Sequence, residues 1–384
     1  MLDFDAQVQQ ALLEVLLTYI PLEINARELT NEKLWQLLGS ASVGQTTVES
    51  VCQSLETAPS GNTVREHLTS ALDQSAEGLQ QLEAQINQAL IAQLPTRLRQ
   101  ELRTKAWEVA GDWITIPYHG VVEEGETEVR GGQPKAGTSK FHTYATLALL
   151  NKNRRVTVAL TVVRPGEKQH QVVDRLLNQA RRLGLRIKRG YFDKAFCSIE
   201  VFKLLRRRRV PYVIPIPQRG ENGIKTLCRG RSGYRTRYTF RNADGSYSTD
   251  VVIACKYSCN RFKRKGVRYF AYAVYGVDEL KPEQVFQAYR RRFSIESGYR
   301  QVHQVRARTS TRNHAWRLLY IGLALLLVNL YVLLRRYCGL LRQYGSRQRR
   351  VFLTLELLAT TLRNYWQKLY GLKQLGALRR PLLN

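Results

Sequence analysis

The chain has 384 residues, and its 44% hydrophobic and 9% aromatic content excludes a disordered polymer and predicts a globular protein with one large core and smaller modules. Its formal net charge of +29 exceeds what solubility requires and predicts a polyanionic partner, either nucleic acid or an anionic membrane surface. Residues 1–95 hold three Lys/Arg against twelve Asp/Glu, whereas the rest of the chain holds 57 basic and 19 acidic groups. The sequence therefore predicts two regions with different roles.

Residues 1–95 are predicted to form an N-terminal helical domain. Helices are expected over 8–19 and 31–38, followed by a helix, a turn and a second helix within 46–69. The breaker Ala-Pro-Ser-Gly separates the last two helices, and Asn62 is expected to cap the second. This pattern is typical of a DNA-reading helix-turn-helix, but its acidic surroundings equally favour a plain bundle for dimerisation or packing.

Residues 96–216 are predicted to form the first part of an α/β core. Strands are expected over 106–117, 141–150, 155–163, 186–192 and 211–215, and helices over 169–183 and 195–206. Three strands, then a helix, a strand, a helix and a strand are the order of an RNase H-like mixed sheet flanked by helices. Pieces at 234–241, 249–256 and 269–277 predict a β-strand insertion over 217–280.

From residue 282 to about 370 the pattern is helical, which predicts the second part of the core over 281–340 and a basic helical C-terminal region over 341–384. Leu318–Leu334 is apolar and close to the length of a membrane span. Arginines flank it on both sides and no second span exists, so we interpret it as a buried core helix and expect no membrane association. Six scattered cysteines and an N-terminus without a signal pattern predict a cytoplasmic protein.

Three acidic side chains stand alone in basic or apolar sequence. Glu296 is the only acid from 284 to 355, a stretch with fourteen arginines. Asp193 is the only acid from 175 to 199 and ends a predicted strand, and Asp112 lies among β-branched and aromatic residues. Phosphodiester cleavage with two metal ions needs a few carboxylate ligands, so isolated acids in cationic sequence are candidates.

Each acid also has an ordinary interpretation. Glu296 could form an ion pair with Arg292 or Arg300, one helical turn away on either side. Asp193 could cap the helix that follows it, and Asp112 could form a turn.

A spaced pattern surrounds the last of these acids. Tyr289, Arg292 and Glu296 are separated by two and three residues, and His303 follows after six more. Asp112 begins the stretch DWITIPYHG, which is similar to the motif Asp-x-Thr-x-x-Pro-Tyr-x-Gly. On these motifs the chain resembles the DDE transposases of bacterial and archaeal insertion sequences, in the insertion-sequence-4-like group with the signature Tyr, Arg, Glu, Lys; histidine replaces the lysine here.

The resemblance covers about residues 105–335 and implies an RNase H-like catalytic core. Asp112, Asp193 and Glu296 would be the catalytic, metal-binding carboxylates, with Mg²⁺ as cofactor and Mn²⁺ able to substitute. The implied partners are double-stranded DNA with terminal inverted repeats and target DNA, with action as a homodimer on paired ends. The side chains expected to bind DNA are Tyr289, Arg291, Arg292, Arg300 and His303. Apart from Arg291, these share with Glu296 the spacing of one helix face.

Basic residues gather in three other stretches, 206–209, 229–241 and 256–268, and in the last two they are interspersed with aromatic residues. On strands such alternation exposes one basic face, which suits a DNA backbone. No tryptophan lies between 206 and 285, so stacking on a flipped base would fall to one of Tyr234, Tyr238 and Tyr247.

The sequence therefore predicts a nucleoid-associated DNA transposase. It would excise an insertion sequence at its terminal repeats and insert it into target DNA by two-metal-ion hydrolysis and strand transfer. The alternatives are a catalytically inactive, domesticated protein that bridges DNA, and a metal-dependent nuclease without strand transfer.

Overall fold

The computed structural model describes residues 4–24, 26–122, 128–151, 154–218, 223–243, 245–257, 267–290, 292, 300–337, 341–344, 347–350 and 353–373. The chain divides into two compact units. Met1–Gln93 and Arg300–Asn384 form the first, which we call the helical unit, and Leu94–Tyr299 form the second, which we call the sheet unit.

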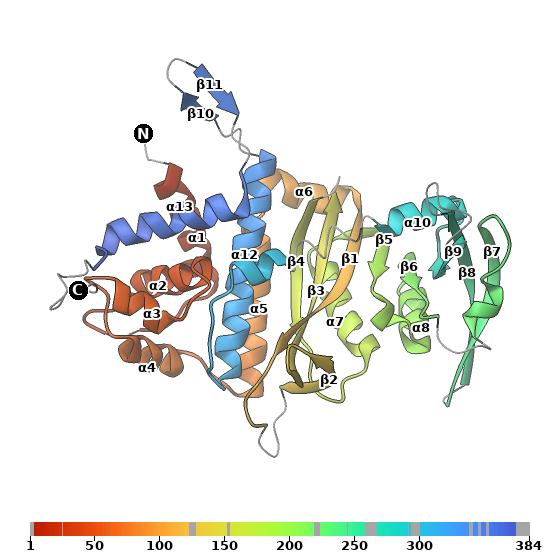
Figure 1. The fold of residues 1–384 in the computed structure, drawn as a ribbon, viewed down its shortest axis with the longest axis horizontal. Coiled ribbons are helices and arrows are strands. Elements are labelled where there is room, and N and C mark those ends of the chain that lie inside the picture. Colours follow the sequence, from red (N-terminus) through yellow and green to blue (C-terminus); the bar gives the residue numbers. More distant parts are fainter. Residues whose placement is uncertain are drawn as a thin grey trace, which may run out of the picture. The chain divides into compact units, whose positions relative to one another are not determined.

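Five helices of the helical unit begin at side chains that accept a hydrogen bond from the first turn. Such caps are Thr30, Thr47, Ser60, Ser75 and Thr354. The helices are α1 (Phe4–Tyr19), α2 (Asn31–Val43), α3 (Val48–Ser54), α4 (Gly61–Ala71), α5 (Ala76–Ala92), α12 (His314–Tyr337) and α13 (Leu355–Tyr370). Figure 1 labels them.

The predicted cap of α4 was wrong by two residues. Ser60 is extended and its hydroxyl accepts a hydrogen bond from the Thr63 amide, 3.1 Å away. Asn62 already lies inside the helix, where its side-chain oxygen accepts from Arg65 instead. A helix, a turn and a helix do occur here as α3 and α4, but both interpretations of that unit remain open.

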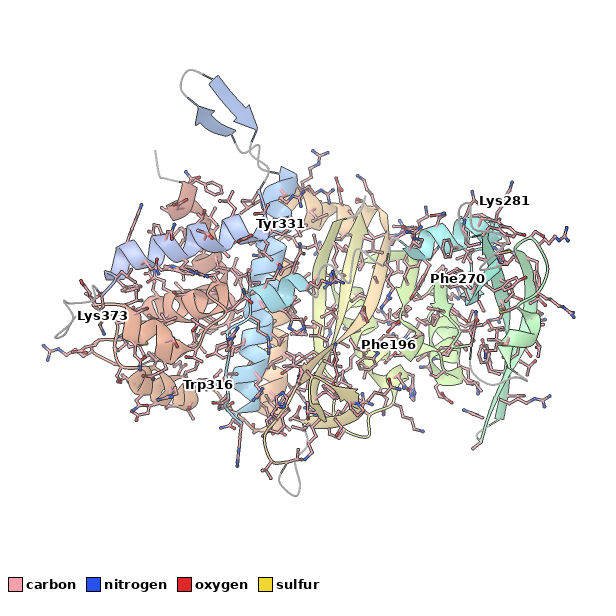
Figure 2. The ribbon with its side chains drawn as sticks, viewed as in Figure 1. Phe196, Phe270, Lys281, Trp316, Tyr331 and Lys373 are labelled. Atoms are coloured by element: carbon pink, nitrogen blue, oxygen red, sulfur yellow. The ribbon has the colours of Figure 1, made fainter. Side chains whose placement is uncertain are left out.

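The apolar run at 318–334 lies within α12, which the sequence predicts as a buried helix. Within the described residues His314–Arg336 is the one segment long and apolar enough to cross a membrane, yet nearly all of it is buried. It packs along α5, where a Cβ atom at Gly322 would lie 2.7 Å from Ile86 Cδ1. Trp316, near its start, and Tyr331, in its second half, are labelled in Figure 2. Such burial confirms the interpretation as a core helix.

The prediction of continuous helix after residue 340 was wrong in one place. Leu341–Tyr344 (β10) and Arg347–Arg350 (β11) pair as an antiparallel hairpin. The pairing runs from Leu341 with Arg350 to Tyr344 with Arg347, and it interrupts the helical pattern around it. The helix resumes at Leu355 as α13.

The sheet unit contains one nine-stranded mixed sheet with helices beside it. Its strands are β1 (Ala106–Pro117), β2 (Val129–Lys135), β3 (Thr138–Asn151), β4 (Arg154–Val162), β5 (Arg186–Phe192), β6 (Tyr212–Pro215), β7 (Tyr234–Asn242), β8 (Gly245–Tyr257) and β9 (Val267–Tyr275). Its helices are α6 (Thr96–Thr104), α7 (Gln169–Arg182), α8 (Ile199–Arg207) and α10 (Pro282–Arg290), with 3₁₀ turns η1 (Lys194–Phe196) and η2 (Ile224–Leu227).

The strand order places β1 between β3 and β5. β3 pairs antiparallel with one edge of β1, and β4 pairs antiparallel with β3. β5 pairs parallel with the other edge of β1, and β6 lies parallel beyond it. The order β4-β3-β1-β5-β6 is the arrangement expected of an RNase H-like core, which confirms the predicted fold class.

The predicted β insertion extends this same sheet. β9 pairs antiparallel with β6, β8 with β9, and β7 with β8, so the ladder continues without a break. The strand β2 was not predicted, and the expected helix over 195–206 is divided into η1 and α8, because Ser198 begins a new helix by capping the Val201 amide.

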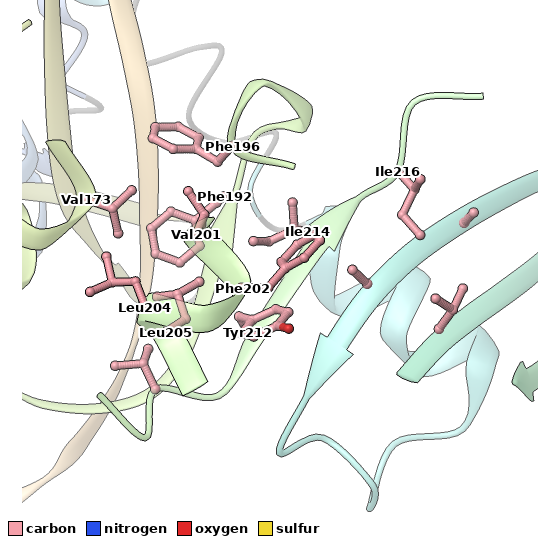
Figure 3. Close-up of a cluster of buried hydrophobic side chains, with 14 of the residues drawn as sticks. Val173, Phe192, Phe196, Val201, Phe202, Leu204, Leu205, Tyr212, Ile214 and Ile216 are labelled. Carbon is pink, nitrogen blue, oxygen red and sulfur yellow. The ribbon is translucent and has the colours of Figure 1, made fainter. Parts of the chain in front are cut away.

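The two faces of the sheet are covered by different helices, and residues alternate between them along each strand. α7 and α8 cover one face, where Phe192, Ile214 and Ile253 are buried; Figure 3 shows part of this cluster. α10 covers the other face, where Tyr191 and Val213 are buried. Because side chains alternate along a strand, residues 110 and 112 of β1, residue 191 of β5 and residue 193 just after β5 belong to the α10 face.

Candidate active site

Asp112 and Asp193 are brought together by the parallel pairing of β1 and β5. The last paired residues of that ladder are Gly111 and Phe192, so the residue that follows each of them is an aspartate. Asp112 lies within β1 and pairs with Thr146 of β3, which excludes the turn predicted as its alternative. Asp193 follows the carboxyl end of β5, where sheet enzymes commonly place their ligands.

The carboxylate of Asp112 is buried and both of its oxygens are engaged. The residue is 6% exposed. Its Oδ1 accepts a hydrogen bond from the Trp113 amide at 2.8 Å, and its Oδ2 accepts from Arg292 Nη2 at 2.6 Å. Burial raises the pKa of this carboxyl to about 6, although the Arg292 charge acts to lower it.

Asp193 is more accessible, with 30% of its side chain exposed. Its Oδ1 accepts from the Lys194 amide at 2.6 Å and so caps η1, as the ordinary interpretation predicted. The same oxygen lies 3.7 Å from Arg292 Nη2. Capping does not exclude a second role, because both aspartates face one guanidinium nitrogen.

Tyr289 and Arg292 support the carboxylates from the α10 side. Arg292 Nη1 donates to the Tyr289 hydroxyl at 3.2 Å, and that hydroxyl donates to the Phe192 carbonyl at 3.4 Å. Each of the two residues is 5% exposed, and burial raises the pKa of the Tyr289 phenol. In this structure the Tyr289 hydroxyl and the Arg292 Nη atoms therefore bind protein groups rather than facing solvent.

An aromatic layer behind the aspartates fixes the two strands. Phe192 lies so close to β1 that a Cβ atom at Gly111 would be 2.6 Å from its ring. Phe196 contacts Phe192 edge-on, with ring centroids 5.7 Å apart, and stacks on Trp113 at 4.8 Å. Since Trp113 directly follows Asp112 and Phe192 directly precedes Asp193, this packing positions the backbone that carries both carboxylates.

The carboxylates line a cavity of about 730 Å³. Its other walls are mainly aromatic and basic: Trp113, Lys194, Pro215, Phe270, Tyr272, Phe286, Tyr289, Arg290 and Arg292. Sequence reasoning missed most of these residues. Adjacency to the two aspartates was the available signal for Trp113 and Lys194, whereas Phe270 (labelled in Figure 2) and Tyr272 come from β9, a strand predicted as part of an insertion.

The remaining predicted site residues have different outcomes. Glu296 and Arg291 lie outside the described residues, so their placement stays a prediction. Arg300 and His303 are exposed and belong to the helical unit. Among the described residues no group of three or more His, Cys, Asp or Glu side chains gathers to hold a metal ion.

The tyrosines predicted for base stacking pack into the protein's own aromatic clusters. Tyr247 stacks on Phe202 at 6.3 Å, and Tyr238 contacts Phe240 at 4.9 Å. The Tyr234 hydroxyl donates to the Leu227 carbonyl. All three lie among the partly buried residues of the α8 face, and none is among the residues that line the cavity.

Comparisons with known proteins identify the family of the chain. The family model described as the transposase DDE domain matches residues 104–330, more than half of the chain. The chain therefore belongs to the transposase DDE domain family. Among solved structures it is similar to the piggyBac transposase in a cryo-EM structure of its synaptic complex with hairpin DNA, with a TM-score of 0.53 and 11% identity over 95% of this chain and 78% of that one. At this identity the likeness supports the fold. A search of curated protein sequences found no match.

Proposed function

We propose that this protein is a cut-and-paste DNA transposase of the insertion-sequence-4-like group, with Asp112, Asp193 and Glu296 as its metal-binding carboxylates. One observation carries the proposal: two aspartates from separate strands face a single cationic nitrogen at the edge of a large cavity. Family membership supports DNA transposition as the activity. The Tyr289, Arg292 and Glu296 spacing supports the group.

The donor set fits a hard divalent cation. Carboxylate oxygens are the ligands that Mg²⁺ and Mn²⁺ prefer, and a cation already lies between these two carboxylates, in the form of Arg292 Nη2. Asp112 and Asp193 would hold the metal with Glu296. When bound, the metal would supply Lewis-acid activation of the attacking oxygen and stabilisation of the leaving oxygen.

The other residues of the site would bind and orient DNA. Lys194 and Arg290 line the cavity and would neutralise phosphates, and the aromatic walls would exclude water from the strand being cut. Double-stranded DNA with terminal inverted repeats and target DNA are the proposed substrates, and the DNA-bound state of the piggyBac structure is consistent with them. Action as a homodimer on paired ends, in the cytoplasm at the nucleoid, completes the proposal.

A nicking assay on DNA that carries the terminal repeats tests the assignment. Asp112→Asn, Asp193→Asn and Glu296→Gln should each lower Mg²⁺-dependent nicking at least about a thousandfold, equivalent to ~4 kcal/mol, while DNA binding in a gel shift persists. Asp174→Asn is the control, because Asp174 pairs with Arg208 on the α7 side of the same unit. Full cleavage by the Asp193 variant would refute the assignment.

Two further outcomes separate the proposal from its rivals. A wild-type protein that binds terminal-repeat DNA but never nicks it would be a DNA-bridging protein. If pre-cleaved ends are incubated with a target plasmid and no joined product forms, the protein is a nuclease without strand transfer.

A further inference from the structure

The guanidinium of Arg292 lies where the two aspartates converge. Its Nη2 is 2.6 Å from Asp112 Oδ2 and 3.7 Å from Asp193 Oδ1. Both Asp112 oxygens are thereby engaged, since Oδ1 accepts from the Trp113 amide. A metal ion held between Asp112 Oδ2 and Asp193 Oδ1 would compete with this guanidinium nitrogen for the same carboxylates.

Arg292 is oriented toward the carboxylates by the protein itself. Its Nη1 donates to the Tyr289 hydroxyl, and its guanidinium carbon lies 5.7 Å from the centroid of the Tyr289 ring. The side chain of Arg292 is 6% exposed and that of Asp112 is 9% exposed. Both terminal nitrogens of this buried arginine, Nη1 and Nη2, therefore bind protein groups. In this structure Arg292 is not an exposed side chain that is available to a DNA phosphate.

We propose that Arg292 is the resident counter-ion of the metal-binding aspartates and changes partners during loading, leaving Asp112 for a DNA phosphate as a divalent cation enters. The inference rests on the proposed function, and it adds a regulation of the same site. Divalent metal and DNA would each promote the binding of the other, because Arg292 must be released for one and captured by the other.

The charges of the site support this exchange. Without Arg292 two carboxylates would face each other across a mostly buried space, which is unfavourable unless another cation compensates them. A guanidinium displaced from Asp112 would in turn lose its 2.6 Å ion pair while still mostly buried. Phosphate oxygens satisfy that need, since they match the planar fork of arginine, and the cavity that Arg292 lines is broad enough to admit them.

The exchange predicts a coupling that works in both directions. By linkage, if DNA raises the affinity for the metal by some factor, the metal raises the affinity for DNA by the same factor. The free protein would hold metal weakly, because the metal competes with Arg292. Cleavage competence would then be assembled chiefly on DNA.

Mn²⁺ binding followed by electron paramagnetic resonance in the absence of DNA tests the proposal without any activity measurement. Arg292→Gln should bind Mn²⁺ on the order of tenfold more tightly than the wild type, because the competing cation is gone. Arg208→Gln is the matched control: it removes an arginine that pairs with Asp174 rather than with the aspartates of the site, so its Mn²⁺ affinity should stay near that of the wild type. Unchanged or weaker Mn²⁺ binding by Arg292→Gln would overturn the proposal.

A milder variant covers the case in which Arg292→Gln does not fold. Tyr289→Phe removes only the hydroxyl that holds Nη1, so it should tighten Mn²⁺ binding in the same direction by a few-fold. Adding terminal-repeat DNA should raise the Mn²⁺ affinity of the wild type more than that of either variant. If DNA raises all three equally, Arg292 does not couple the two ligands.

Asp112→Asn separates failure of this proposal from failure of the proposed function. If the aspartates do bind metal, the wild type binds Mn²⁺ and Asp112→Asn loses that binding, whatever Arg292 does. If neither the wild type nor Arg292→Gln binds Mn²⁺ and Asp112→Asn changes nothing, the metal site itself is wrong. Wild-type binding that depends on Asp112 but not on Arg292 rejects the exchange alone.

Discussion

The helical unit and the sheet unit use acidic side chains in different ways. In the helical unit Glu32, Glu49 and Glu77 lie in the first turns of helices, where a negative charge stabilises the helix end. Glu49 has 38% of its side chain exposed and lies 3.4 Å from Arg65. Asp112 in the sheet unit is buried and faces a cation from a distant part of the chain.

The comparison shows how the role of an acid follows from its surroundings. A carboxylate at an exposed helix start contributes charge to one element, and water or another acid can replace it with little change. A carboxylate that is buried across from a second carboxylate depends on position as well as on charge. The two units should therefore respond differently to the same kind of substitution.

The largest difference between the two units is expected in the nicking rate, for a substitution that keeps the carboxylate but shifts its position. Asp112→Glu should lower nicking about a hundredfold, because one added methylene group displaces the carboxylate from its place beside Asp193. Glu49→Asp makes the reverse change at an exposed helix start and should leave nicking unaltered. Nicking rates on terminal-repeat DNA measure both. Equal losses would show that the two acids are not used differently.

Glycine-to-alanine substitutions compare close packing in the two units. A Cβ atom would lie 2.6 Å from the Phe192 ring at Gly111 and 2.7 Å from Ile86 at Gly322. Each variant should lose about 1–3 kcal/mol in the free energy of unfolding, measured with urea. Only Gly111→Ala should also weaken Mn²⁺ binding by the folded protein, since Gly111 precedes Asp112. A similar Mn²⁺ defect in Gly322→Ala would contradict this distinction.

The pH dependence of stability should differ between the units in EDTA. Burial raises the pKa of Asp112 from 3.8 to about 6 and that of Cys52 from 9.0 to about 11. Each folded pKa lies above its unfolded value, so each contribution is complete below the unfolded pKa and is lost as pH rises through the folded one. The sheet unit should lose stability between about pH 4 and pH 6, and the helical unit between about pH 9 and pH 11.

Urea unfolding across these two ranges measures both losses. Asp112→Asn should flatten the acidic range alone, and Cys52→Ala the alkaline range alone. An acidic range that keeps its slope in Asp112→Asn would assign the effect to another group.

The smallest effect is expected at a helix cap. Ser60→Ala removes the hydroxyl that accepts from the Thr63 amide at the start of α4 and should lower stability by about 1 kcal/mol. Asn62→Ala is the comparison, because Asn62 is not the cap, and it should change stability less. Thermal unfolding followed by circular dichroism distinguishes the two variants.

Much of the secondary structure follows from local pattern. The bounds predicted for β1 and β5 coincide with those observed, and α7 differs by one residue at its end. Alternation of period two and helical periodicity are properties of neighbouring residues, so a sequence displays them directly. The β10–β11 hairpin was not predicted, because strands of four residues are too short to show a clear alternation within a sequence whose overall pattern is helical.

The sequence by itself also identified Asp112 and Asp193 as candidate site residues, since they stand out against basic and apolar surroundings. Only the tertiary structure decided that they lie side by side, because the parallel ladder of β1 and β5 joins segments some eighty residues apart. It also decided that the insertion strands extend the core sheet and that Arg292 faces the aspartates. Strand pairing and burial depend on contacts between residues that are distant in the chain. The local sequence around one residue does not specify which distant residue it contacts.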